Sequence, residues 1–442
     1  MFRRKIYDKL LTWKSESDGR TAVLIEGARR IGKSTIAEEF AKNEYGSYIL
    51  IDFAKEPKEV RDLFEDISDL NFLFLQLQLR FHVDLIERNS VIILDEVQLC
   101  PRARQAIKYL VKDHRYDYIE TGSLISIRKN IKDIVIPSEE HTINMFPMDY
   151  EEFLWAIGDS STYGLIRQCF ERWKPIGQQT NRVLMRTFRL YMLVGGMPQA
   201  VQEYLVTNNF KRVDFVKRDI LCLYERDFSR IDETGRAGRL FDAIPAQLNG
   251  NASRYQVSSV LKASRAQDIG RLLAEMENSK TVLLSYHVHD PNVGLSASKS
   301  LTQFKMFVCD TGLFTTLMFK DKEFTENTIY EKLLNDKLPA NLGYLYENAV
   351  AQILTANGDE LYYHTFKTEG KSHLREIDFL LARESKICPL EVKSSRSKQH
   401  VSMDEFCAKY SSRVLRKYIV YTKDFEKDKD VICIPIYASP FL

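Results

Sequence analysis

The sequence has little of what marks a secreted, disulfide-bonded or membrane-spanning protein. Its seven cysteines are scattered singly, without a C-x-x-C pair, so they predict neither a disulfide framework nor a zinc site. No apolar run is long enough to cross a bilayer, and the basic residues 1–5 lead into polar positions rather than into the apolar core of a signal peptide. The sequence therefore predicts a cytoplasmic protein without a membrane partner.

An excess of charge of one sign is also missing. Lysine and arginine number 63 against 61 aspartates and glutamates, which gives a formal net charge of +2 at pH 7. This total does not indicate nucleic-acid binding, although local basic patches are compatible with it. The 442 residues, of which 44% are hydrophobic and 28% charged, predict a globular chain of about three domains.

One segment near the start has the pattern of a phosphate-binding loop. An apolar run at residues 22–25 is followed by G-x-x-x-x-G-K-S and then by a helix-forming segment. The glycines let backbone N–H groups curve around phosphate oxygens, Lys33 supplies a cation for the β- and γ-phosphates, and the Ser34 hydroxyl can ligate Mg²⁺. The motif predicts binding of ATP with Mg²⁺ by Gly27, Ala28, Arg29, Arg30, Ile31, Gly32, Lys33, Ser34 and Thr35.

A second apolar stretch, residues 91–94, ends in two carboxylates. Such a run is typical of a buried parallel strand that carries acids at its carboxyl end. We expect Asp95 to hold the Mg²⁺ shell together with Ser34, and Glu96 to orient or deprotonate the attacking water. Lys33 contributes to the same catalysis through its positive charge. A phosphate loop and an acid pair on one chain indicate an ATP hydrolase.

Residues 20–145 alternate strand-like and helix-like segments. This alternation predicts a parallel sheet flanked by helices, with nucleotide at the carboxyl ends of the strands. One of these strands ends in hydroxyls, so Thr121 or Ser123 is a candidate sensor of the γ-phosphate or of the attacking water, with ordinary turn chemistry as the alternative. The expected strands are residues 22–25, 48–53, 91–94, 118–121 and 134–136.

After Pro147 the pattern changes to long amphipathic stretches, which predict a helical lid over the ATP site. A winged helix-turn-helix is expected next, with helices at residues 240–248, 255–263 and 268–277 and a β-hairpin wing at 281–286 and 305–309. The third helix carries Glu275 and Glu277 beside a single Arg271, so DNA binding and a protein-interaction or structural role stay equally open.

A second chemical constellation lies near the C-terminus, where two short strands carry a D…E-x-K pattern. Asp378 precedes Glu391 and Lys393, and period-two alternation puts the last two on one strand face. The acids can share Mg²⁺ and the lysine can position or activate water for phosphodiester attack. Glu347, on a helix-forming segment upstream, is expected to complete the metal shell. A solvated hairpin is the alternative, since the pattern alone is degenerate.

The order of these pieces resembles a large prokaryotic family of AAA-type ATPases. In that family a P-loop module precedes a winged-helix segment and a restriction-endonuclease-like domain of unknown function. The resemblance implies an α/β fold: a P-loop parallel sheet with a helical lid, a winged helix-turn-helix and a C-terminal α/β nuclease-like domain. The expected bounds are 1–147 for the P-loop module, 148–235 for the helical lid, 236–325 for the winged helix-turn-helix and 326–442 for the nuclease-like domain. The resemblance rests on residues 27–35, 94–96, 121–123, 146–149, 194–198, 310–313, 343–350, 376–379 and 391–393.

Two functions are compatible with these motifs. The first is a nucleotide-switched nuclease, in which ATP at Lys33 and Asp95 controls cutting of DNA or RNA at Asp378, Glu391 and Lys393. The second is a non-cutting ATPase that binds a partner protein or DNA through its C-terminal domains as a switch or scaffold. A small-molecule kinase is supported by the phosphate loop alone. Oligomer formation is compatible with both, because AAA-type sites often take an arginine from a neighbour.

Overall fold

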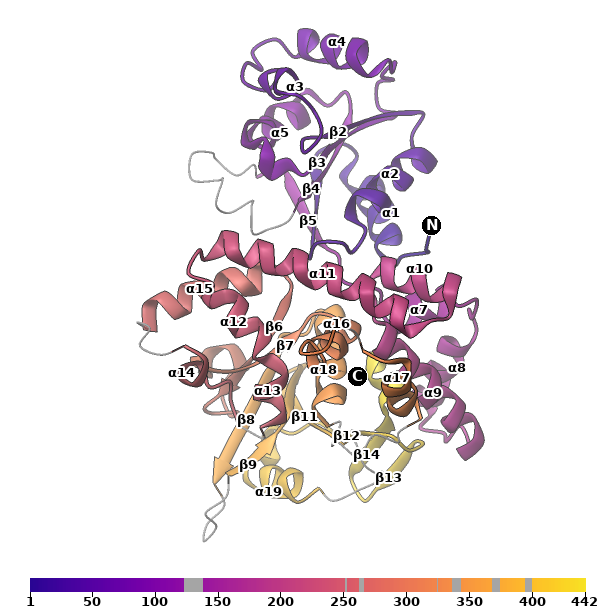
Figure 1. The fold of residues 1–442 in the computed structure, drawn as a ribbon, viewed down its shortest axis with the longest axis vertical. Helices are drawn as coiled ribbons and strands as arrows, with labels where there is room; N and C mark the ends of the chain where they lie inside the picture. Colours follow the sequence, from indigo (N-terminus) through magenta and orange to yellow (C-terminus); the bar gives the residue numbers. More distant parts are fainter. Residues whose placement is uncertain are drawn as a thin grey trace. The chain divides into compact units, whose positions relative to one another are not determined.

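The computed structural model describes residues 1–122, 138–250, 253–261, 266–323, 325–335, 343–367, 374–393 and 400–442 (Figure 1). The chain divides into two compact units. The first comprises Met1–Phe146 with Asn278–Lys280 and contains the phosphate loop; the second comprises Pro147–Glu277 with Thr281–Leu442 and contains the D…E-x-K motif. In the part of the chain described, no helix combines the length and the apolar character that crossing a membrane requires.

The first unit is built on a five-stranded sheet in the order β2-β3-β4-β1-β5, with every neighbouring pair parallel. The parallel sheet predicted for this region is confirmed. Four expected strands appear; the expected strand at 134–136 lies outside the described residues, and the fifth strand of the sheet is β5. The strands are β1 (Ala22–Glu26), β2 (Ser47–Asp52), β3 (Ser90–Asp95), β4 (Asp117–Gly122) and β5 (Glu140–Asn144).

Helices cover this sheet and supply its hydrophobic core. β3 and β4 are buried along their whole length, as expected for central strands with covered faces. α4 and α5 pack Leu73, Leu77 and Leu110 against one face, in a single buried cluster with Ile92 and Leu94. The helices are α1 (Ile6–Ser17), α2 (Lys33–Glu44), α3 (Lys58–Asp62), α4 (Leu70–Phe81) and α5 (Pro101–Asp113), with a 3-10 turn η1 (Val97–Leu99).

The second unit opens with five helices, which form because of local signals in the sequence. Asp149 begins α7 with a complete capping box: its Oδ1 accepts from Glu152 N at 2.9 Å, and Glu152 Oε2 accepts from Asp149 N at 3.1 Å. Pro198, in the first turn of α10, starts that helix after the Gly195-Gly196 break. The helices are α7 (Tyr150–Ala156), α8 (Thr162–Arg172), α9 (Gln178–Val194), α10 (Pro198–Thr207) and α11 (Phe210–Ile231).

The expected three helices of the winged segment differ in detail from the observed ones. The first is divided: α12 (Arg236–Asp242) ends before α13 (Ile244–Asn249), where Pro245 in the first turn of α13 starts a new helix. The second is reduced to α14 (Val257–Val260), and the third is α15 (Ala266–Asn278). Residues 262 and 263 of the expected second helix lie outside the described residues.

The hairpin expected as a wing forms part of a larger sheet. β6 (Val282–Val288) and β7 (Lys299–Val308) are antiparallel, and β6 also pairs in parallel with β8 (Tyr362–Lys367). β8 in turn pairs with β9 (Leu374–Ile377), which gives the order β7-β6-β8-β9. This sheet joins segments on both sides of residue 325, where the sequence predicted a domain boundary.

A second sheet of five strands follows in the order β10-β11-β12-β14-β13. Its central pairs, β11 with β12 and β12 with β14, are parallel, and its outer pairs are antiparallel. Its strands are β10 (Phe379–Arg383), β11 (Lys386–Val392), β12 (Lys417–Tyr421), β13 (Glu426–Asp428) and β14 (Val431–Pro435). The remaining helices of the unit are α16 (Thr311–Met318), α17 (Asn327–Leu334), α18 (Gly343–Ala356) and α19 (Val401–Lys409), with 3-10 turns η3 (Leu295–Ser298), η4 (Ser411–Arg413) and η5 (Ile436–Phe441).

Two motifs without deducible chemistry in the sequence meet at one crossing of the backbone. A Cβ on Gly196 would lie 2.1 Å from Met148 O, and one on Gly312 would lie 2.5 Å from Val194 O, so both positions require glycine. Asp310, which is fully buried, accepts from Gly196 N at 2.6 Å and from Leu313 N at 2.9 Å, and thereby caps α16. Gly-Gly-x-Pro and Asp-Thr-Gly-Leu are thus packing motifs of the second unit.

Candidate active sites

The phosphate loop connects β1 to α2, as the motif predicts. Gly27 lies too close to Met145 for a side chain, since its Cβ would be 2.3 Å from Met145 O. Gly32 has a φ of 95° at the N-cap of α2, a conformation that favours glycine. Ala28 and Ile31 are buried, whereas Arg30 and Thr35 are exposed. The loop is therefore anchored by its apolar residues, with α2 starting at Lys33.

The polar residues assigned to nucleotide and Mg²⁺ converge at the edge of the sheet. Ser34 Oγ donates to Asp95 Oδ1 at 2.7 Å, and Thr121 Oγ1 donates to the same carboxylate oxygen. Lys33 Nζ donates to the backbone oxygens of Gly27 and Ala28 at 2.9 and 2.8 Å. A hydroxyl and a carboxylate oxygen side by side are the donor set that suits Mg²⁺ beside a bound triphosphate. Ser123, the other candidate sensor, lies outside the described residues.

Glu96 follows directly after β3, with a φ of 53°, and its Oε2 accepts a hydrogen bond from Gln98 Nε2. Gln98 is buried and so fixes the direction of this carboxylate. Positive φ at a residue other than glycine is uncommon and is concentrated at functional sites. Glu96 is thus a partly exposed carboxylate oriented at the carboxyl end of the strand that bears Asp95.

Arg4 is a contributor to the loop that the sequence did not reveal. Its guanidinium donates to Ile31 O at 2.9 Å and to Phe146 O at 2.6 Å, and the residue is only 6% exposed. The planar fork of an arginine can hold two acceptors in fixed geometry. The N-terminal segment therefore clamps the phosphate loop, a contact between residues 27 positions apart that no local pattern predicts.

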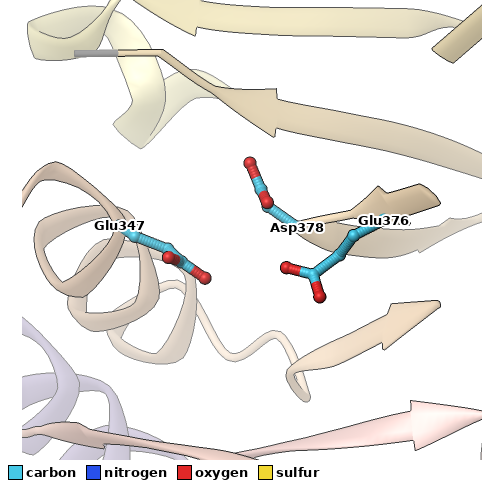
Figure 2. A group of neighbouring side chains, drawn as sticks. All are labelled: Glu347, Glu376 and Asp378. Atoms are coloured by element: carbon cyan, nitrogen blue, oxygen red, sulfur yellow. The ribbon is translucent and has the colours of Figure 1, made fainter. Parts of the chain in front are cut away.

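The second site is an acidic cluster in the second unit. Glu347, Glu376 and Asp378 each offer a carboxylate oxygen, and the three oxygens lie within 4.8 Å of one another. Figure 2 shows the side chains of Glu347, on α18, and Glu376, on β9, pointing toward one another beside Asp378. Between the first two lies the ammonium of Lys305 from β7, at 2.6 Å from Glu347 Oε1 and 2.5 Å from Glu376 Oε1.

The electrostatics of this cluster follow from burial and mutual proximity. Burial raises the pKa of Glu347 to about 7, against the opposing effect of Lys305, and burial also raises the pKa of Glu376. Burial disfavours the charged lysine, but the two neighbouring carboxylates hold the pKa of Lys305 well above its usual value. The cluster opens into a pocket of about 480 Å³, lined also by Leu248, Asn249, Ser253, Gly343, Tyr344, Leu374 and Val392.

The structure places the predicted nuclease residues in two adjoining groups. Glu347 and Asp378 lie together with Glu376. Glu391, whose side chain is 2% exposed, lies against Lys393, with Oε2 and Nζ 2.5 Å apart. Asp378 Oδ2 accepts from Val392 N at 2.7 Å, which joins the two groups. Oε1 of Glu391 has no hydrogen-bond partner among the described residues.

Two members of this site, Glu376 and Lys305, were not predicted from the sequence. Glu376 had a signal, because it stands two residues before Asp378, and alternate residues of an extended segment share a face. Lys305 had a weaker one: it is a lysine within the apolar run 304–309, and a lysine is rarely buried unless it is paired.

Comparisons with known families agree with the first site. Residues 19–154 match a family model described as an AAA domain. Together with the parallel sheet and the phosphate loop, this match shows that residues 19–154 carry a P-loop ATPase domain of the AAA type. Residues 185–323 and 342–438 match two further models, described as domains of unknown function DUF8612 and DUF4143.

Solved structures give distant likenesses. A Walker-type ATPase of Pyrococcus abyssi aligns over 72% of this chain and 96% of its own, with 16% sequence identity and a TM-score of 0.41. The RuvB Holliday junction branch migration motor of Thermotoga maritima aligns over 64% of this chain and 89% of its own, with 13% identity and a TM-score of 0.29. A search of curated proteins found no match.

Proposed function

We propose that this chain is a Mg²⁺-dependent ATPase whose nucleotide state controls a nuclease-like site in the second unit. The observation that carries the proposal is the convergence of Glu347, Glu376 and Asp378 in a pocket, with Lys393 directly after β11, whose last residue, Val392, donates to Asp378. The ATPase has its own complete residue set in the first unit, so the chain has two separate acid-and-lysine sites.

At the ATP site each residue has a role that its contacts support. Lys33 Nζ, which now donates to two backbone oxygens, would contact the β- and γ-phosphates instead. Ser34 and Asp95 would hold Mg²⁺, which would neutralise phosphate charge. Glu96, oriented by Gln98, accepts a proton from the attacking water. Thr121 fixes Asp95 from the neighbouring strand, and the loop amides from Gly27 to Thr35 surround the phosphates.

At the acidic site the ligand atoms fit a hard divalent cation, because all of them are carboxylate oxygens. Glu347, Glu376 and Asp378 would hold the ion, and Glu391 is a further candidate ligand through its Oε1, which has no hydrogen-bond partner among the described residues. Lys393, whose side chain is 31% exposed, reaches solvent and positions the water that attacks a phosphodiester. The substrate class proposed is DNA, in the cytoplasm.

One observation favours a second candidate. Lys305 already pairs with two of the three carboxylates, as a purely structural ion cluster would. On this alternative the chain is a non-cutting ATPase switch or scaffold that binds a partner protein or DNA through residues 147–442. Oligomer formation is compatible with both candidates.

ATP hydrolysis in the purified chain tests the first part of the proposal. Lys33→Ala is expected to abolish Mg²⁺-dependent hydrolysis, because the loop loses its phosphate cation. Lys42→Ala is the matched control: it removes a lysine from the same helix, where the side chain is 49% exposed and pairs with Glu38. An equal loss of ATP hydrolysis in both variants would contradict the assignment of Lys33 to the ATP site.

Plasmid nicking tests the second part. Asp378→Asn keeps the size of the side chain but removes its charge, so Mg²⁺-dependent nicking should disappear while ATP hydrolysis continues. Asp404→Asn is the control, since Asp404 is 53% exposed and pairs with His400 on α19. Nicking that persists in Asp378→Asn excludes the nuclease site; hydrolysis without nicking in any variant favours the non-cutting alternative.

A further inference from the structure

Lys305 reaches the acidic cluster from outside the C-terminal family match. It lies on β7, within the segment 185–323, whereas Glu347, Glu376 and Asp378 all lie within 342–438. The middle segment therefore supplies the cation of a site whose carboxylates belong to the C-terminal segment. This contact links residues 42 and 71 positions apart in the chain.

The position of this lysine is built into the fold. Val308, three residues after Lys305, donates its N–H to Asn348 Oδ1 at 2.9 Å, and Asn348 Nδ2 donates to Val308 O at 3.0 Å. Asn348 is fully buried and follows Glu347 directly on α18. These two hydrogen bonds hold β7 against α18, and this places Lys305 opposite Glu347. A buried amide with both groups satisfied is a specific contact rather than a surface coincidence.

The ammonium occupies the place that a bridging metal ion needs. Its Nζ is 2.6 Å from one oxygen of Glu347 and 2.5 Å from one oxygen of Glu376. A Mg²⁺ or Mn²⁺ ion bridging the same oxygens would stand at about 2.0–2.1 Å from each, so the two cations would overlap and repel. Three carboxylates face one ammonium in this cluster, and a divalent ion would supply more positive charge than the lysine does.

We propose that Lys305 is a built-in competitor for the divalent cation, which closes the acidic site until the ammonium leaves Glu347 and Glu376. The inference rests on the proposed metal site and adds its regulation. In its present position Lys305 Nζ also lies 5.5 Å from the ring centroid of Tyr363 on β8. Because the ammonium stands on a flexible four-carbon stem, its departure from the carboxylates requires rotation of one side chain rather than unfolding of β7.

The test is Mn²⁺ binding to the full-length protein without nucleotide, measured by calorimetry or by electron paramagnetic resonance. Lys305→Met keeps the length of the side chain and removes the competing charge. We expect this variant to bind Mn²⁺ about tenfold more tightly, or more, than the wild type. The binding that belongs to the cluster is the part lost when Asp378→Asn is added to each protein.

Lys320→Met is the matched control. Lys320 also bridges two carboxylates, at 2.5 Å from Glu225 and 2.6 Å from Asp242, but its side chain is 39% exposed. This variant should bind Mn²⁺ as the wild type does. If Lys305→Met is unfolded without metal, folding restored by Mn²⁺ supports the proposal, because the ion then replaces the lost charge; absence of that rescue contradicts it.

The outcomes separate this inference from the proposed function. If the wild type binds Mn²⁺ at the cluster and Lys305→Met binds it equally or more weakly, Lys305 does not compete with the ion. The proposed metal site is then retained. Absence of Asp378-dependent binding in both proteins overturns the metal site itself, and the competitor role with it. Binding by Lys305→Met alone supports the competitor role and shows that the wild-type site is closed.

Discussion

Asp310 offers a quantitative test of the packing in the second unit. Its carboxylate accepts from Leu313 N and from Gly196 N, and the side chain is fully buried. Burial raises the pKa of this carboxyl, and the two backbone donors oppose that effect. Replacing Asp310 by alanine removes the cap of α16 and leaves the Gly196 N–H buried without an acceptor.

The expected cost is the sum of these two effects. Loss of a helix cap costs about 0.5–2 kcal/mol, and a buried unsatisfied N–H costs about 1–3 kcal/mol. We therefore expect Asp310→Ala to lower the free energy of unfolding of the second unit by about 1.5–5 kcal/mol. Asp149→Ala is the matched control, because its capping box lies at a partly exposed helix start and its loss should cost only about 1 kcal/mol.

Tryptophan fluorescence in urea can report on this unit alone. The chain has three tryptophans: Trp13 in the first unit and Trp155 and Trp173 in the second. In a Trp13→Phe background the fluorescence transition therefore follows residues 147–442. If Asp310→Ala lowers the free energy of unfolding no more than Asp149→Ala does in this background, the two contacts of Asp310 do not have the predicted effect.

Three further predictions concern single residues. Glu96→Gln should lower ATP hydrolysis by about 10²–10⁴-fold and leave nucleotide binding intact, as turnover and fluorescent-nucleotide titration will show. Arg4→Ala should destabilise the first unit by about 1–3 kcal/mol and weaken nucleotide binding, because Ile31 O and Phe146 O lose a buried donor; unchanged thermal unfolding of that unit would contradict this. Burial lowers the pKa of Lys217 to about 8, below its usual 10.5. Between pH 8 and pH 10.5 the unfolded chain therefore binds more protons at this lysine than the folded chain does. The contribution of Lys217 to the free energy of unfolding rises with pH in that range. Lys217→Met should remove this rise. If the free energy of unfolding changes with pH equally in the wild type and in Lys217→Met, Lys217 is not its cause.

The sequence predicted the first unit well because its signals are local. The phosphate loop, the strand ending at Asp95 and the alternation of strands with helices each lie within a few residues of one another, so a linear pattern contains them. Arg4 was missed because its acceptors, Ile31 and Phe146, are far away in the chain. The expected strand at 134–136 lies outside the described residues, and the fifth strand of the sheet, β5 (Glu140–Asn144), was not predicted.

The second unit was predicted less completely because it depends on pairing between distant segments. A hairpin pattern at β6 and β7 is the same whether the hairpin stands alone as a wing or pairs further, and only the register of Tyr286 with Tyr362 reveals the larger sheet. The same limit applies to the acidic site. Spacing grouped Asp378 with Glu391 and Lys393, while the contact of Lys305 with Glu347 depends on how β7 lies against α18.

In the proposed function, the nucleotide state of the first unit controls the acidic site of the second. The most direct measurement is plasmid nicking with Mg²⁺, with and without ATP, beside ATP hydrolysis, in the wild type, Lys33→Ala and Asp378→Ala. We expect ATP to change the nicking rate of the wild type only, hydrolysis to be lost in Lys33→Ala, and nicking to be lost in Asp378→Ala with hydrolysis retained. A nicking rate that ATP leaves unchanged in the wild type, or nicking that survives Asp378→Ala, would contradict the account.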